Sequence, residues 1–139
     1  LQDLMAIRGM LLCWTAREVA RAVAAEGREL VARSRLRETV DALETPDASP
    51  AELQLRDFDF FAELAKLSGN RVIGLLIEPV RQVYLHNREI FEALYRPGVF
   101  DPRHHRRVLD AIERGDAQAA ASAMEAYASV ARFGEEVRS

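Results

Sequence analysis

Residues 49–70 read SPAELQLRDFDFFAELAKLSGN and carry helix signals at both ends. Ser49 is a good helix N-cap, Pro50 suits the first helical position, and Glu52 completes a capping box. The Ser-Gly-Asn run at 68–70 is a credible C-terminal signal. Between these signals the apolar residues recur at helical spacing, so the stretch predicts one long amphipathic helix.

Similar punctuation divides the rest of the chain into helices joined by short connections. The expected helices cover residues 3–26, 28–43, 50–67, 71–95, about 102–114 and about 117–137. Pro79 lies inside the fourth, where we expect a kink. Strand-like alternation is lacking, and short connections favour antiparallel neighbours. The sequence therefore predicts an all-α antiparallel bundle of about six or seven helices.

The composition predicts a single domain rather than a nucleic-acid-binding or membrane protein. The 139 residues carry a net charge of −3, whereas a DNA-binding surface is usually basic. The single Cys13 excludes an internal disulfide and fits a cytoplasmic location. No apolar run reaches membrane-spanning length, and no signal peptide is visible. The chain begins at Leu1, from which we expect a fragment of a longer protein.

Three polar residues interrupt predicted apolar stripes on three different helices: Asp57, His105 and Tyr127. Helical periodicity directs each of them inward, while Asp59 and His104 should face outward. A buried polar group needs a partner or a ligand. The three residues therefore indicate a pocket, although a paired structural carboxylate, a satisfied core histidine and a core tyrosine would give the same pattern.

Further inward candidates are Arg8 on the first helix and Tyr84 and Asn87 on the fourth. An inward arginine is costly unless it meets an anion, which Asp57 or an anionic ligand could supply. Catalytic signatures are absent: the sequence has no phosphate loop, nucleophile elbow, zinc-protease motif or paired cysteines. This pattern favours a binding domain over an enzyme.

Three segments together resemble the effector-binding domain of GntR-type transcription regulators of the FadR-like branch. They are RDFDFFAELAKLSGN at 56–70, HRRVLDAIERGD at 105–116 followed by Ala123-Met124, and IRGML at 7–11. The resemblance covers nearly the whole chain. It implies a ligand-sensing domain that dimerises and that works beside an N-terminal winged helix-turn-helix, absent from this chain, which would bind operator DNA.

In much of this family an Asp and three His bind a divalent metal that helps to hold a carboxylate effector. Asp57 and His105 match two of those positions, but Phe61 and Tyr127 replace two of the histidines. Phe has no ligand atom and neutral Tyr is a poor ligand, so no metal cofactor is expected. If a metal were present, Asp57 and His105 would be its ligands.

The same two replacements are similar to those of acyl-CoA-sensing members of the FadR-like branch. The resemblance therefore implies a fatty acyl-CoA or fatty-acid effector and a homodimer. The residues that it implies for ligand binding are Arg8, Asp57, Phe61, Tyr84, His105 and Tyr127. Pro79, and Glu135 where an aromatic residue would be expected near the ligand, depart from that pattern.

Three other hypotheses stay open. The first is a metal-assisted sensor of a small organic acid that uses Asp57, His105 and water or His86. The second is a helical enzyme with Asp57 and His105 as an acid–base pair, although the sequence supplies no nucleophile or oxyanion donor. The third is a plain helical dimerisation module with a filled core.

Overall fold

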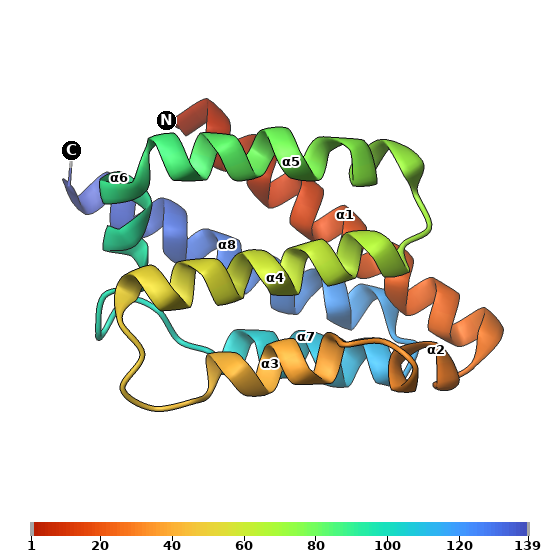
Figure 1. Cartoon of the computed structure of the whole chain (residues 1–139). Coiled ribbons are helices and arrows are strands. Elements are labelled where there is room, and N and C mark those ends of the chain that lie inside the picture. The colour runs from red at the N-terminus through yellow and green to blue at the C-terminus, as the bar shows by residue number, and fades with distance from the viewer. Residues whose placement is uncertain (1, 139) are drawn as a thin grey trace.

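A computed structural model describes the backbone of residues 2–138 and the side chains of residues 2–129 (Figure 1). The described part is all-helical and contains no strand, which confirms the predicted class. It comprises eight α-helices and one 3-10 helix: α1 (Gln2–Glu26), α2 (Glu29–Ala32), α3 (Leu36–Leu43), α4 (Pro50–Leu67), α5 (Arg71–His86), α6 (Arg88–Glu92), η1 (Ala93–Tyr95), α7 (Arg103–Glu113) and α8 (Ala117–Arg138).

The core lies where α1, α4, α7 and α8 meet. α1 packs along α8, α7 packs against both of them, and α3 lies against α4. α5 lies beside α4 along the upper edge in Figure 1. The largest fully buried side chains come from these packed helices and from the segment after α5: Phe60, Phe91, Leu36, Leu43, Leu64, Leu109, Ile112 and Met124.

The predicted helix signals are confirmed where they were strongest. Ser49 accepts a hydrogen bond from the Glu52 amide, and the Glu52 side chain accepts one from the Ser49 amide, which completes the capping box of α4. Gly115 follows α7 with φ of +70°, a left-handed conformation that favours glycine. Asp116 then caps α8 by accepting from the Ala119 amide.

Two predicted helices are each broken, which corrects their expected extents. The helix expected at 28–43 stops at Ala32 and resumes at Leu36, because the Ser34 hydroxyl donates to the Val31 carbonyl and accepts from the Leu36 amide. The helix expected at 71–95 stops at His86. Asn87 leaves helical geometry, with φ −119° and ψ 35°, and its side-chain amide donates to the Val83 carbonyl.

The Ser34 hydroxyl satisfies backbone groups that a continuing helix would have used, whereas the Val83 carbonyl accepts from both the backbone and the side-chain amide of Asn87. The break also exposes Asn87, which was expected to face inward. α5 itself continues through Pro79.

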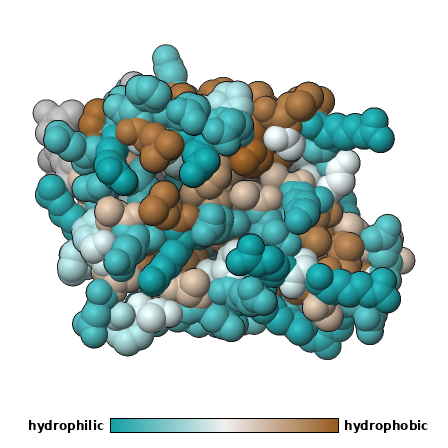
Figure 2. All heavy atoms as spheres, viewed as in Figure 1, coloured by the Kyte–Doolittle hydropathy of each residue, from teal (hydrophilic) through white to brown (hydrophobic). Residues whose placement is uncertain are grey.

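Helix α5 is the least deeply buried of the long helices whose side chains are all described. Ile73 is its one buried residue, and Val72, Leu75 and Leu76 are exposed. Figure 2 shows apolar side chains gathered along the upper edge of this face, over α5. No described helix is long and apolar enough to cross a membrane. The side chains of Val130, Ala131 and Glu135 lie outside the described residues.

Candidate functional site: a buried polar cluster beside an apolar cavity

Asp57 is the centre of a buried cluster contributed by α1, α4, α5, η1, α7 and α8. Its Oδ1 lies 2.7 Å from His105 Nε2, and its Oδ2 accepts a hydrogen bond from the Tyr95 hydroxyl at 2.6 Å and another from Tyr127. Arg8 Nη2 lies 3.5 Å from the same Oδ2. Both carboxylate oxygens are therefore engaged within the protein.

Arg8 extends the cluster toward α5. Its Nε donates to the Tyr84 hydroxyl at 2.8 Å, and its Nη2 donates to the Tyr127 hydroxyl at 3.0 Å. The guanidinium also lies 5.1 Å from the centre of the Tyr127 ring. The Arg8 side chain is only 8% exposed, so these contacts replace the water that a free guanidinium would bind. The Arg8–Tyr84 hydrogen bond joins α1 directly to α5.

The environment holds the cluster in one charge state. Burial alone would raise the pKa of Asp57, but the charge and hydrogen bond of His105, with Arg8 and Tyr127, lower it to about 2. Burial, together with the negative charge of Asp57, raises the pKa of Tyr127 and of Tyr95 far above the ordinary value. At neutral pH the cluster therefore contains an ionised Asp57, a charged Arg8 and protonated tyrosines.

The hydrogen bond between Asp57 and His105 sets the direction of the proton. An ionised carboxylate can only accept, so His105 Nε2 donates to Oδ1. His105 Nδ1 is buried and has no hydrogen-bond partner among the described residues. His104 was expected to be exposed but is half-buried, with its ring centre 6.1 Å from that of Tyr127. Burial is the main reason that the pKa of His104 is lowered.

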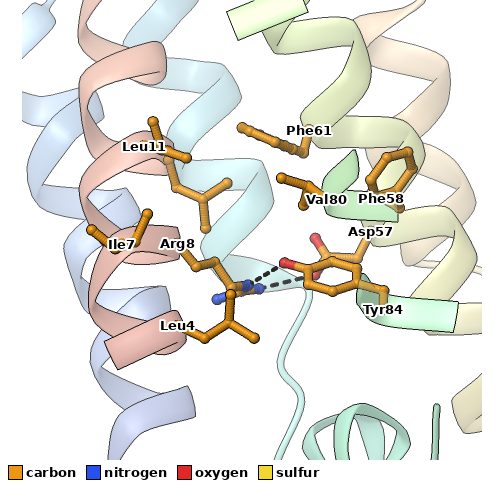
Figure 3. Close-up of a pocket in the computed structure, with 10 residues that line it drawn as sticks. Leu4, Ile7, Arg8, Leu11, Asp57, Phe58, Phe61, Val80 and Tyr84 are labelled. Atoms are coloured by element: carbon orange, nitrogen blue, oxygen red, sulfur yellow. Dashed lines mark hydrogen bonds and ion pairs between the residues drawn. The ribbon is translucent and has the colours of Figure 1, made fainter. Parts of the chain in front are cut away.

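An apolar cavity of about 50 Å³ lies on the α5 side of this cluster (Figure 3). Its polar wall is formed by Arg8, Asp57 and Tyr84. The remaining lining residues are Leu4, Ile7, Leu11, Leu12, Phe58, Phe61 and Val80. A volume of this size holds roughly three or four water molecules. The cavity is thus a small apolar space with one polar, hydrogen-bonded side.

The structure brings together all six residues expected to bind a ligand, but in two layers. Arg8, Asp57, Phe61 and Tyr84 line the cavity, whereas His105 and Tyr127 are not among its lining residues. Both stand behind Asp57, in contact with its carboxylate. His86 is exposed on α5, where its Nδ1 lies 2.7 Å from the Gln82 carbonyl.

Sequence reasoning missed Tyr95 and most of the apolar lining. Tyr95 follows Phe91 by four residues on the stripe of the expected fourth helix, and this spacing was the available signal. In the structure it belongs to η1 and donates to Asp57. Leu4 and Leu11 also line the cavity, but nothing in their spacing along the sequence distinguishes a cavity wall from a filled core.

The residues present do not fit the divalent metal that binds in much of the family that the sequence resembles. Phe61 offers no ligand atom, and the Tyr127 hydroxyl, with its raised pKa, is a protonated donor to Asp57. Asp57 and His105 bond directly to one another at 2.7 Å. Within the part of the chain whose side chains are described, no three His, Cys, Asp or Glu side chains come together as a metal site would need.

Comparison with known proteins gives one family match. A family model described as the FCD domain matches residues 3–129, and this span includes every residue of the Asp57 cluster. No curated protein and no solved structure matches the chain. FCD domains are regulatory ligand-binding domains of GntR-family regulators, and the helical fold described above agrees with that assignment. The chain belongs to the FCD domain family.

Proposed function

We propose that this FCD domain senses a fatty acyl-CoA or a fatty acid in a metal-free pocket and thereby modulates DNA binding. The observation that carries the proposal is the apolar cavity between α1, α4 and α5 with Arg8, Asp57 and Tyr84 on its polar side. The aliphatic and aromatic walls suit a hydrocarbon chain. Arg8 and Tyr84 supply hydrogen-bonding groups on the polar side of this pocket.

A long acyl chain requires more space than the present cavity offers, so binding must displace part of its wall. Helix α5 is the long helix that can move at least cost, because Ile73 is its one buried residue. Its polar attachment to α1 is the Tyr84–Arg8 hydrogen bond. A ligand that separates α5 from α1 would favour one arrangement of the domain over another, as a regulatory ligand must.

The metal-free character of the pocket is part of this proposal. Arg8 supplies the positive charge beside Asp57 that a metal supplies in metal-binding relatives, and Phe61 adds apolar surface to the cavity. The metal-assisted sensor of a small organic acid is the alternative within the same family. It would require Asp57 and His105 to give up their mutual hydrogen bond.

We also propose the partners that the resemblance implies. They are a second copy of the chain and operator DNA, the latter bound through an N-terminal winged helix-turn-helix. Val72, Leu75 and Leu76 on α5 expose apolar surface of the kind that homodimer interfaces cover. A cytoplasmic location is the expectation for a regulator that acts on DNA. Sedimentation equilibrium should give a dimer, and Leu75→Glu should weaken it if α5 lies in the interface.

The ligand is tested by thermal-shift and native mass measurements with acyl-CoAs and fatty acids of increasing length, beside small carboxylates with and without divalent metal. The expected result is a shift with long acyl ligands that chelator leaves unchanged. Leu11→Trp, which adds bulk to the cavity, should abolish the shift. The matched control is Met10→Trp, because Met10 is exposed on the same helix. A thermal shift with small carboxylates alone would contradict the proposal.

A further inference from the structure

A second compartment lies next to the apolar cavity, and the two share a wall. Phe58 of α4 and Tyr84 of α5 line both spaces. Their rings meet edge to face with centres 6.0 Å apart. The second compartment has a volume of about 20 Å³, and its other lining residues are Ala51, Gln54, Leu55, Arg81, Leu85 and Arg88. Figure 3 shows the shared pair on the side of the cavity opposite Ile7 and Leu11.

The two compartments differ in charge. Asp57 and Arg8 neutralise one another beside the first, whereas Arg81 and Arg88 both line the second, which has no acidic lining residue. Arg81 Nη1 lies 3.7 Å from Glu78 Oε2 within α5, and Arg88 Nε lies 3.6 Å from Glu92 Oε1 within α6. Both arginine side chains are about half exposed, so these ion pairs are weak. The two guanidinium groups are therefore available to an anion.

This difference decides where the charged end of an acyl ligand is more stable. An anion placed at Arg8 would add a second negative charge to a buried site where the guanidinium already faces Asp57. Burying a charge without its own counter-charge is costly. At Arg81 and Arg88 the same anion would meet two cations and would stay partly hydrated. Electrostatics thus favours a ligand whose head points away from Arg8.

We infer that the second compartment is the head-group subsite of the proposed acyl ligand. The acyl chain fills the cavity beside Arg8, passes the Phe58–Tyr84 pair, and places its anionic head between Arg81 and Arg88. The head is either the phosphate-bearing part of a coenzyme A thioester or the carboxylate of a free acid. This inference rests on the proposed function, and it assigns the two arginines a role in ligand selection.

The test is a calorimetric titration of the purified chain with three probes of equal chain length, each below its micelle-forming concentration. The probes are dodecanoyl-CoA, dodecanoate and the neutral dodecanol. The variant is the double substitution Arg81→Gln and Arg88→Gln. The matched control is Arg71→Gln, since Arg71 is exposed on α5, the helix of Arg81, and does not line either space. Circular dichroism checks that each variant retains its helices.

The double variant should weaken binding of an anionic probe about tenfold, because two charge-assisted contacts are lost. The double variant should bind dodecanol with an affinity within about twofold of that of the unchanged chain. Arg71→Gln should leave the affinities for all three probes unchanged. The anionic probe that shows the loss identifies the head group. If neither anionic probe loses affinity, or if dodecanol loses as much, the subsite is overturned while the proposed function stands. If the unchanged chain binds no probe, both are overturned.

Discussion

Removal of the Asp57 carboxylate should destabilise the domain far more than removal of a surface carboxylate. Asp57→Asn keeps the side-chain shape but leaves the Arg8 guanidinium buried without an anion, and it replaces the acceptor of two tyrosine hydroxyls. Loss of one partner of a buried pair costs about 3–5 kcal/mol. Because Asn retains one carbonyl acceptor, we expect about 3 kcal/mol. The control Asp59→Asn, exposed on the same helix, should change stability by less than about 0.5 kcal/mol.

A double-mutant cycle separates the pair from general disruption of the core. Arg8→Met leaves Asp57 with hydrogen bonds from His105, Tyr95 and Tyr127, so it should cost about 2 kcal/mol. The double variant Arg8→Met with Asp57→Asn removes both charges, and its cost should fall short of the sum by at least about 1 kcal/mol. Urea unfolding with unchanged m-values gives these free energies. If the loss of stability in the double variant equals the sum of the two single losses to within about 0.3 kcal/mol, the coupling between Arg8 and Asp57 is refuted.

The remaining predictions concern pH, a helix end and a turn. The pKa of Asp57 is lowered from 3.8 in the unfolded chain to about 2 in the folded domain, so ionised Asp57 stabilises the fold by about 2 kcal/mol. This stabilisation is complete above the unfolded pKa and disappears as the pH falls through the folded pKa. Urea unfolding from about pH 5 to pH 2 should show the loss of stability, and Asp57→Asn should not show it. Ser49→Ala removes the capping box and should cost about 1 kcal/mol in the same assay; no change would mean that the cap is dispensable. Gly115→Ala should reduce the free energy of unfolding more than Gly69→Ala does. Both glycines have positive φ, but only a Cβ at position 115 would meet the Ala24 backbone, at 3.1 Å. Equal losses of stability would contradict this clash.

Local signals predicted much of the fold because they act within a few residues. The Ser49 capping box and the Gly115 turn follow from hydrogen bonds and backbone conformations that neighbouring residues determine. The breaks at Ser34 and Asn87 were missed although they are also local. Each residue can also be accommodated inside a helix, so its presence alone does not predict the side-chain bond to the backbone that forms here.

Most polar residues of the site could be predicted from the sequence, but Tyr95, most of the apolar lining and the arrangement of the site could not. Helical periodicity directed Asp57, His105 and Tyr127 inward, and all three are buried together. Sequence could not show that both carboxylate oxygens of Asp57 would bond to neighbouring side chains, because those side chains come from four other elements whose positions only the fold determines. It also could not show that the cavity lies on the α5 side, with His105 and Tyr127 behind the carboxylate.

Whether the pocket binds an acyl ligand without metal is measured by titrating the metal-stripped chain, in the presence of chelator, with dodecanoyl-CoA and dodecanoate. The proposed metal-free pocket predicts saturable binding of at least one of them, at one ligand per chain, which added divalent metal leaves unchanged and Leu11→Trp abolishes. Binding that appears only after metal is restored, or binding of small organic acids alone, would contradict it.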